Sequence, residues 1–398
     1  MNGCAYNSPI NEIAIANVIR PGTTSHGRQQ RIWIGNRDQT HHRMRHEPRR
    51  PVRPWQHSIM HVMTHLPAHT VEAFVDTTAN LPPLRMDYVF AEPAAVLAQS
   101  EVLAVIGFGR AAPAIDDPRW LRLPLEPVEA TAPLEVWRGT APVDRGVDGA
   151  LRWASDGNYT MLSLALDEAS HGGIAPAAQA AYALLSRWRH TSATPHLLRL
   201  WNYLDAINDG DDDNERYRQF CAGRATGMDA ALAAAYPAAT AIGLRDGRRI
   251  LYVYALAARQ PGVAVENPRQ LNAWRYPRRY GPTAPGFVRG MRAPTSTAQL
   301  FISGTAAIVG HASLHAEDCG AQLDETLANL RTLLSAAHSR ASLGANSLLK
   351  VYVRRADDAP AIHAALRQQV ESPAGIVLLH ADICRRELLL EIDGLHCG

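Results

Sequence analysis

The sequence predicts an α+β fold built from two tandem α/β sandwich halves, in which helices cover the sheets. The 398 residues are enough for about two domains, since domains of roughly 100 to 200 residues are usual. Hydrophobic residues make up 46% and charged residues 20% of the chain, as in ordinary globular proteins. From residue 60 onward, apolar runs of strand length alternate with segments of helical periodicity, and this order recurs. We expect an extension over 1–59, a first half over 60–240 and a second half over 241–398.

Residues 1–59 are expected to be a disordered, basic extension. The first 60 residues contain nine arginines and three acidic residues, with little apolar periodicity. The basic character of the chain belongs to this segment, so the net charge of +2 does not indicate a nucleic-acid-binding body. A transit peptide, an RNA-binding arm and an upstream extension without a role are the alternatives for it.

The chain is expected to be cytoplasmic, with neither a membrane nor a nucleic acid as partner. No window reaches the roughly 18 apolar residues of a membrane-spanning helix. The five cysteines show no C-x-x-C spacing, which argues against a zinc ribbon and favours a reducing compartment. A monomer and a homo-oligomer both stay open.

In the first half, short apolar runs predict strands and longer segments predict helices. The predicted strands are 102–108, 134–138 and 161–166. Alanine and leucine at helical spacing predict a helix over 174–189. The segment 196–208 (HLLRLWNYLDAIN) is interpreted as a second helix and 214–228 as a third, with an acidic turn between them.

The second half repeats the alternation. Its order of strand, long helix, strand, helix and two closing strands is typical of a sheet with helices on one face. The predicted elements are strands at 250–256 and 300–303, a helix at 321–337, a strand at 348–353, a helix at 359–370, and strands at 375–383 and 387–392.

The segment 266–289 (ENPRQLNAWRYPRRYGPTAPGFVR) holds the densest cluster of unusual residues. Five arginines alternate with aromatic residues and with prolines, which fix the backbone. Long structured loops are often binding loops, and arginine suits bidentate capture of carboxylate or phosphate. The alternative is a stack of rings and guanidinium groups that covers an interface.

A second cluster follows in 199–224. If this segment is helical, Arg199, Asn202 and Tyr203 lie within about one turn and present a guanidinium, an amide and a phenol to one ligand. The arginines near its end either extend that site or pair with the acidic turn.

A third cluster spans 303–325. Small residues at Ser303, Gly304 and Thr305 let a ligand approach backbone amides. Gln322 and Glu325 share one face at the start of a helix. Burial raises the pKa of a glutamate, as a general acid requires, whereas the helix dipole holds it ionised; both readings stay open.

No metal or organic cofactor is expected. His311 and His315 are four residues apart, but no H-E-x-x-H pattern is present. Gly107 to Ala112 fits G-x-G-x-x-A, yet Pro113 interrupts the helix that a dinucleotide fingerprint needs. Cys319 is either a reactive thiol or a small buried residue.

At these clusters the sequence resembles the chorismatase family, the chorismate-converting hydrolases and hydroxybenzoate synthases. The matching stretches are RLWNYLDAIN with ERYRQFCAGR, then 266–289, then FISGTAAIVGHASLHAEDCGAQLDETLANL. The resemblance covers roughly residue 60 to the C-terminus. The last stretch also looks like the Rid (YjgF-like, chorismate mutase-like) fold, which implies two Rid-like halves with the catalytic residues in the second.

The resemblance implies a cofactor-independent enzyme that protonates the enolpyruvyl methylene of chorismate and cleaves the ether to release pyruvate. It implies that Glu325 is the proton donor, with Gln322 and Cys319 beside it. The two carboxylates of chorismate call for arginines and for hydroxyl or amide donors. The implied binding residues are Arg199, Tyr203, Arg275, Tyr276, Arg279, Arg289, Ser303, Gly304 and Thr305.

The resemblance leaves two products open. Rearrangement without water gives 3-hydroxybenzoate, with or without the 4-hydroxy isomer, whereas water attack gives a trans-dihydroxycyclohexadiene carboxylate. Cys319 and the small residues of 238–243 resemble the benzoate-forming types. The competing functions are a non-catalytic Rid-like metabolite-binding protein and a Rid-like imine deaminase.

Overall fold

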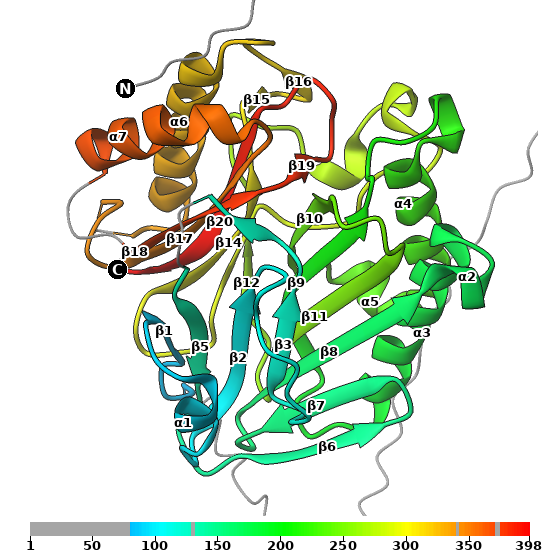
Figure 1. Cartoon of the computed structure of the whole chain (residues 1–398), viewed down its shortest axis with the longest axis vertical. Helices are drawn as coiled ribbons and strands as arrows, with labels where there is room; N and C mark the ends of the chain where they lie inside the picture. The colour runs from blue at the N-terminus through cyan, green and yellow to red at the C-terminus, as the bar shows by residue number, and fades with distance from the viewer. Residues whose placement is uncertain (1–79, 129–131, 340–341, 371–374) are drawn as a thin grey trace, which may run out of the picture. The chain divides into compact units, whose positions relative to one another are not determined.

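The structure, a computed structural model, describes residues 80–128, 132–339, 342–370 and 375–398 (Figure 1). All of them belong to one compact unit that begins at Val75. The extension expected over 1–59 lies outside the described residues. Within the described part of the chain, no helix has the length and apolar character needed to cross a membrane.

The first large sheet has seven strands in the order β19-β10-β9-β11-β8-β7-β6. The strands β9 and β10 are parallel, and every other neighbouring pair is antiparallel. Its elements are β6 (Asp144–Asp148), β7 (Leu151–Ser155), β8 (Tyr159–Asp167), α3 (Ile174–Thr191), β9 (His196–Asp205), α4 (Arg216–Gly227), β10 (Ala238–Leu244) and β11 (Ile250–Ala258), with β19 (Asp382–Ile383) at the edge.

The second large sheet has the order β12-β13-β14-β20-β17-β18-β4. Here β17 and β18 are the parallel pair. Its elements are β12 (Val263–Val265), β13 (Gly290–Arg292), β14 (Gln299–Thr305), α6 (Cys319–Ala336), β17 (Ser347–Val353), α7 (Ala359–Gln369), β18 (Gly375–His380) and β20 (Leu390–Cys397), with β4 (Glu126–Pro127) at the edge.

The two sheets follow one plan, which confirms the predicted α+β fold with two similar halves. In each sheet, three antiparallel strands are followed along the chain by a helix, a central strand, a second helix and a strand parallel to the central one. A final strand then inserts between the third strand and the central strand. The change of sheet comes after Ala258, between β11 and β12, and not at residue 240. The expected boundary falls too early because β10 and β11 complete the first sheet.

Helices cover one face of each large sheet (Figure 1). The helices α3 and α4 pack on the first sheet, and α6 and α7 on the second. At Gly223 of α4 a Cβ atom would lie 2.0 Å from the carbonyl oxygen of Ala175 in α3. Only glycine allows this approach of the two helix backbones.

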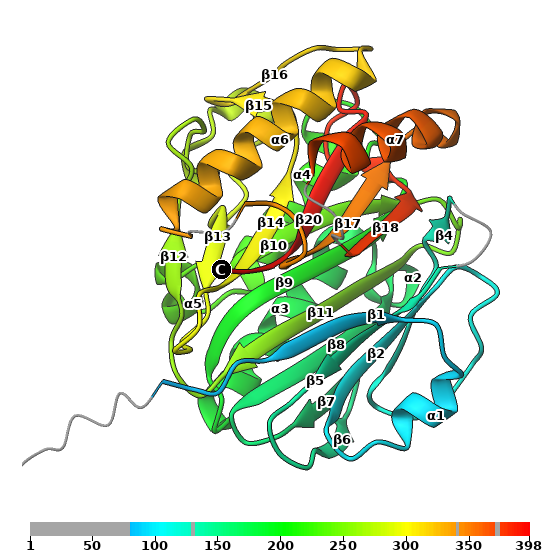
Figure 2. The same ribbon diagram turned by 90° about the vertical axis from the view of Figure 1, so that its left-hand side faces the viewer.

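A smaller sheet covers the opposite faces. Its strand order is β1-β5-β2-β3. One short helix, α1, lies beside this sheet (Figure 2). The elements are β1 (Arg85–Val89), α1 (Pro93–Leu97), β2 (Val102–Phe108), β3 (Trp120–Leu123) and β5 (Leu134–Arg138). The largest apolar cluster joins all three sheets: the ring of Trp137 lies 5.7 Å from that of Trp201 and 6.3 Å from that of Phe301.

The segment 196–208 contains a strand, so the helix expected there is wrong. The strand β9 lies between β10 and β11 and is covered on both faces, which explains its nearly continuous apolar character. Its alternation places Trp201 and Tyr203 in the core shared with the small sheet, and Leu200 and Leu204 under the helices. The predicted grouping of Arg199, Asn202 and Tyr203 on one helical face does not occur.

Candidate functional site

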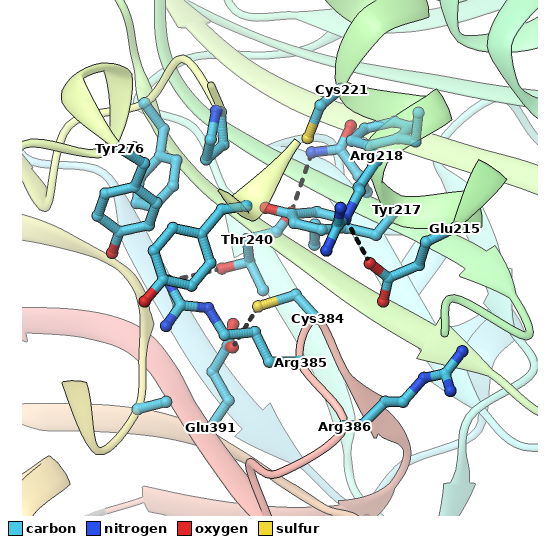
Figure 3. Close-up of a pocket in the computed structure, with 18 of the residues that line it drawn as sticks. Glu215, Tyr217, Arg218, Cys221, Thr240, Tyr276, Cys384, Arg385, Arg386 and Glu391 are labelled. Carbon is cyan, nitrogen blue, oxygen red and sulfur yellow. Dashed lines mark hydrogen bonds and ion pairs between the residues drawn. The ribbon is translucent and has the colours of Figure 1, made fainter. Parts of the chain in front are cut away.

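A cavity of about 410 Å³ lies where β10 of the first sheet meets β14 and β20 of the second (Figure 3). Its walls come from α4 and the turn before it, from the proline-rich loop over 276–289, and from the segment that links β19 to β20. Cavities of this size suit small-molecule ligands.

Glu391 of β20 is the buried carboxyl group of the cavity. Its residue is 5% exposed. Burial raises its pKa to about 8, and the negative charge of Asp393 adds to that shift, while Arg199, Arg289 and Arg385 oppose it. A Cβ atom at Gly304 would lie 1.9 Å from Glu391 Oε1, so only glycine leaves room for this carboxyl group.

Two thiols face the same cavity. Cys384 Sγ lies 4.0 Å from Glu391 Oε2, and Figure 3 shows Cys384 and Arg385 beside Glu391. Cys221 enters from α4. Burial raises the pKa of Cys384, and it raises the pKa of Cys221 to about 11. Both are therefore neutral thiols at pH 7.

Two buried arginines, Arg224 and Arg289, line the cavity without an ion-pair partner among the described residues. Arg224 donates to the Gly286 carbonyl at 2.6 Å, and Arg289 donates to the Leu271 carbonyl at 2.8 Å and to Tyr276 Oη at 2.7 Å. Each is 3% exposed. Their Nε atoms have no hydrogen-bond partner among the described residues. Buried guanidinium groups with donors left free favour an anionic ligand.

Further arginines complete the basic lining. Arg385 donates to the His311 carbonyl at 2.9 Å and lies 4.0 Å from the centre of the Tyr280 ring. Arg279 lies 2.7 Å from His311 Nδ1. Arg218, in contrast, pairs with Glu215 at 2.9 Å. The cavity therefore carries more cationic than anionic side chains around Glu391.

The structure brings four predicted site residues to the cavity. Tyr276, Arg279 and Arg289 come from the proline-rich loop, and Gly304 from the end of β14. The Gly304 amide donates to Thr240 Oγ1 at 2.9 Å. Small residues of β10 form the neighbouring wall, as the stretch 238–243 suggested.

Glu325 does not line the cavity, contrary to expectation. Its carboxylate binds Arg269 and lies 3.6 Å from His315 Nε2. The face of α6 that carries Glu325 is turned toward Arg269, near the start of the segment 266–289. The predicted acid is therefore held as one partner of an ion pair, away from the buried carboxyl group of β20.

Gln322 and Cys319 also lie outside the cavity lining. Gln322 is fully buried; its amide donates to the Glu387 carbonyl at 2.8 Å and accepts from the Leu389 amide at 2.8 Å. It thus holds the segment that carries Cys384 and Arg385. Cys319 begins α6, and burial raises its pKa to about 12.

The remaining predicted residues support the site or lie apart from it. Arg199 and Tyr203 are fully buried and lie outside the cavity lining. Ser303 donates to the Val288 carbonyl at 2.5 Å, and Thr305 donates to the Ser303 carbonyl at 2.9 Å. Arg275 is exposed and outside the lining.

Sequence reasoning missed Glu391, Cys384 and Arg385 as site residues. A signal was present for the first, since Glu391 and Asp393 interrupt the apolar run LLLEIDGL over 388–395. Carboxyl groups inside a buried strand are costly, and such groups gather at functional sites. No comparable sequence signal distinguishes Cys384 or Arg385. Arg224 is one of the arginines expected either to extend the site or to pair with the acidic turn, and it lines the cavity.

Comparison with known proteins identifies relatives along most of the described chain. The family model described as "Chorismatase FkbO/Hyg5-like, N-terminal" matches residues 135–257. A 3-hydroxybenzoate synthase of Streptomyces hygroscopicus is 37% identical over an alignment of 277 residues that covers 66% of this chain and 80% of that protein. A chorismatase of the same organism is 36% identical over 272 residues, 66% of this chain and 78% of that protein.

A solved structure gives the same result. The crystal structure of a chorismatase aligns with a TM-score of 0.69 and 31% identity, and it covers 80% of this chain and 98% of that chain. The YjgF gene product of E. coli aligns over 34% of this chain with a TM-score of 0.26. By the identity and coverage of the 3-hydroxybenzoate synthase and the chorismatase of Streptomyces hygroscopicus, the chain belongs to the chorismatase family.

Proposed function

We propose that this protein is a chorismatase in which Glu391 protonates the enolpyruvyl methylene of chorismate, so that the ether bond breaks and pyruvate leaves. The observation that carries the proposal is a buried carboxyl group, its pKa raised to about 8, in a cavity lined by arginines. The names of the relatives support the substrate.

The cavity matches the charge of this substrate. Chorismate carries two carboxylates, and Arg224, Arg289 and Arg385 offer guanidinium groups in a protected setting. A protein that only binds such a dianion gains nothing from a carboxyl group among these arginines, because like charges repel once that group ionises. The presence of Glu391 therefore favours an enzyme over a binding protein.

The chemistry follows from the surroundings of Glu391. In its protonated form it gives a proton to the methylene carbon, which leaves an oxocarbenium-like centre at the ether carbon. The carboxylate that remains faces Arg199, Arg289 and Arg385, which favour its charged form. These arginines therefore stabilise the state that forms as the proton is transferred.

The product proposed is 3-hydroxybenzoate. This outcome needs no added water, since chorismate has the composition of 3-hydroxybenzoate plus pyruvate. The name of the first relative supports it. The residues around Glu391 also support this product: the cysteine beside it is Cys384 rather than Cys319, and Ala239 and Ala241 form a wall of small residues.

We also assign the reaction to the cytoplasm, which the free thiols of the four described cysteines support.

Incubation of the purified protein with chorismate tests the proposal. We expect equimolar pyruvate and 3-hydroxybenzoate from the unaltered protein and no pyruvate from Glu391→Gln. The matched control is Glu325→Gln, the same substitution outside the cavity, which retains activity. A dihydroxycyclohexadiene carboxylate as the product would contradict the proposed outcome, and an active Glu391→Gln variant would remove Glu391 from the mechanism.

A further inference from the structure

Four buried, charged side chains outside the cavity lining form what we call the buried tetrad: Glu135, Arg199, Lys350 and Asp393. Their residues are at most 1% exposed. They come from all three sheets, on β5, β9, β17 and β20 respectively. Lys350 is also the only lysine of the chain.

The tetrad is a closed set of ion pairs with balanced charge. Lys350 Nζ lies 2.9 Å from Glu135 Oε2 and 3.9 Å from Asp393 Oδ1. Arg199 Nη2 lies 3.0 Å from Asp393 Oδ2. Two cations therefore meet two carboxylates. A buried pair of charges is seldom better for stability than apolar side chains of the same volume, so stability alone does not account for this arrangement.

Asp393 connects the tetrad to the cavity. It is two residues from Glu391 on β20, so both carboxyl groups project from the same face of the strand. Asp393 Oδ2 also accepts hydrogen bonds from Thr240 Oγ1 at 2.8 Å and from Tyr352 Oη at 3.0 Å. Thr240 lines the cavity and accepts the Gly304 amide.

The environment of Glu391 contains charges of both signs. Burial is the largest cause of its raised pKa and Asp393 the second, whereas Arg199 lowers it. At short range inside a protein such charges act strongly on one another. The charged and titratable groups that face Glu391 are Asp393, Arg199, Arg289, Arg385, Cys384 and Tyr217.

We infer that the buried tetrad positions the proton of the proposed reaction: Asp393 keeps the Glu391 carboxyl group protonated at neutral pH, and Arg199 stabilises the carboxylate that the transfer leaves. The inference rests on the proposed function. It makes Asp393 and Arg199 positioning residues, which act through Glu391 without touching the substrate.

Opposite substitutions in the tetrad provide the test, read from the pH profile of kcat/KM, which reports ionisations of the free enzyme. Asp393→Asn gives the tetrad a net positive charge, so the alkaline limb near pH 8 moves to lower pH, by about one unit. Arg199→Met gives it a net negative charge, and the limb moves to higher pH. Lys350→Met has the same charge effect and replaces Arg199→Met if that variant does not fold.

The control is Asp117→Asn, which removes the carboxylate of another protected ion pair. Asp117 lies 2.8 Å from the buried Arg119, in the loop that joins β2 to β3 of the smaller sheet and outside the cavity lining. We expect the alkaline limb of the kcat/KM profile of Asp117→Asn to stay in place. Limbs that fail to move, or that move the same way in both tetrad variants, overturn the inference and leave the proposed function intact. Absence of pyruvate release by the unaltered protein overturns the proposed function itself.

Discussion

At Glu391, two opposing effects act on one carboxyl group. Removal from water favours the neutral acid, and three guanidinium groups favour the carboxylate. Burial prevails, and the pKa rises to about 8. The acid therefore holds its proton at pH 7, yet it has strong cationic partners as soon as the proton leaves. A general acid works best when its pKa lies near the working pH.

Gly304→Ala tests whether the position of this carboxyl group matters. The added methyl group would occupy the place of Glu391 Oε1, so the carboxyl group has to move. We expect kcat/KM to fall by about 100-fold, as displacements near 1 Å in active sites can cause. Steady-state assays of pyruvate release measure this.

The matched control is Gly320→Ala on α6, where the new Cβ would meet only Asp318 Oδ1 at 3.6 Å. This variant should keep the activity of the unaltered protein. Equal activity of Gly304→Ala would show that the packing of Gly304 against Glu391 is irrelevant to the reaction.

At the scale of single elements, period and length predicted the longer helices and many of the central strands, because an apolar face with a clear period was present. The strands β6, β7, β10, β12 and β13 were not predicted. The helix α6 and the strands β11 and β17 follow the expected ranges. The strand β9 was predicted as a helix: it is buried on both faces, and Arg199 and Asn202 three positions apart imitated a helical period. Which face α6 turns to the cavity depends on packing partners far away in sequence, so the role assigned to Glu325 could not be checked before the fold was known.

Gln322 joins an element to the site without touching the cavity. Gln322→Ala leaves the Leu389 amide and the Glu387 carbonyl without their partner inside the protein. We expect a loss of about 1–3 kcal/mol in the free energy of unfolding, the cost of unsatisfied buried polar groups. We also expect a lower kcat, because the segment with Cys384 and Arg385 loses its anchor.

Urea unfolding and pyruvate release measure these two effects. Gln369→Ala is the control, since the Gln369 side chain is exposed and, among the residues that the structure describes, bonds to Asp324 alone. If Gln322→Ala is no less stable than Gln369→Ala, then Gln322 does not hold this segment.

At the scale of the whole described unit, the repeat of one plan in two halves was predictable from the order of elements. The smaller sheet was not predictable in this way. Neither was the pairing of β4 with the second sheet and of β19 with the first, because β4 and β19 are two-residue strands whose pairing depends on tertiary contacts. The cavity itself arises where the two sheets meet. Glu391, Arg224 and Cys384 become neighbours only through that contact, so local sequence patterns identified few of the cavity residues.

The shared core predicts that all three sheets unfold together. Trp137→Ala removes a ring that contacts Trp201 and Phe301 from the other sheets. We expect one cooperative transition whose free energy falls by about 3–5 kcal/mol. Val147→Ala, at a residue that is 57% exposed, should change it by less than about 0.5 kcal/mol. Two separate unfolding transitions would contradict a common core.

The central claim is that an exchangeable proton on Glu391 moves to the methylene carbon of chorismate. The most direct measurement is turnover in D₂O, with pyruvate reduced as it forms and its methyl group analysed by mass spectrometry. We expect a single deuterium in that methyl group from the unaltered protein and no pyruvate from Glu391→Gln. Pyruvate without deuterium, or deuterated pyruvate formed at an undiminished rate by Glu391→Gln, would contradict the claim.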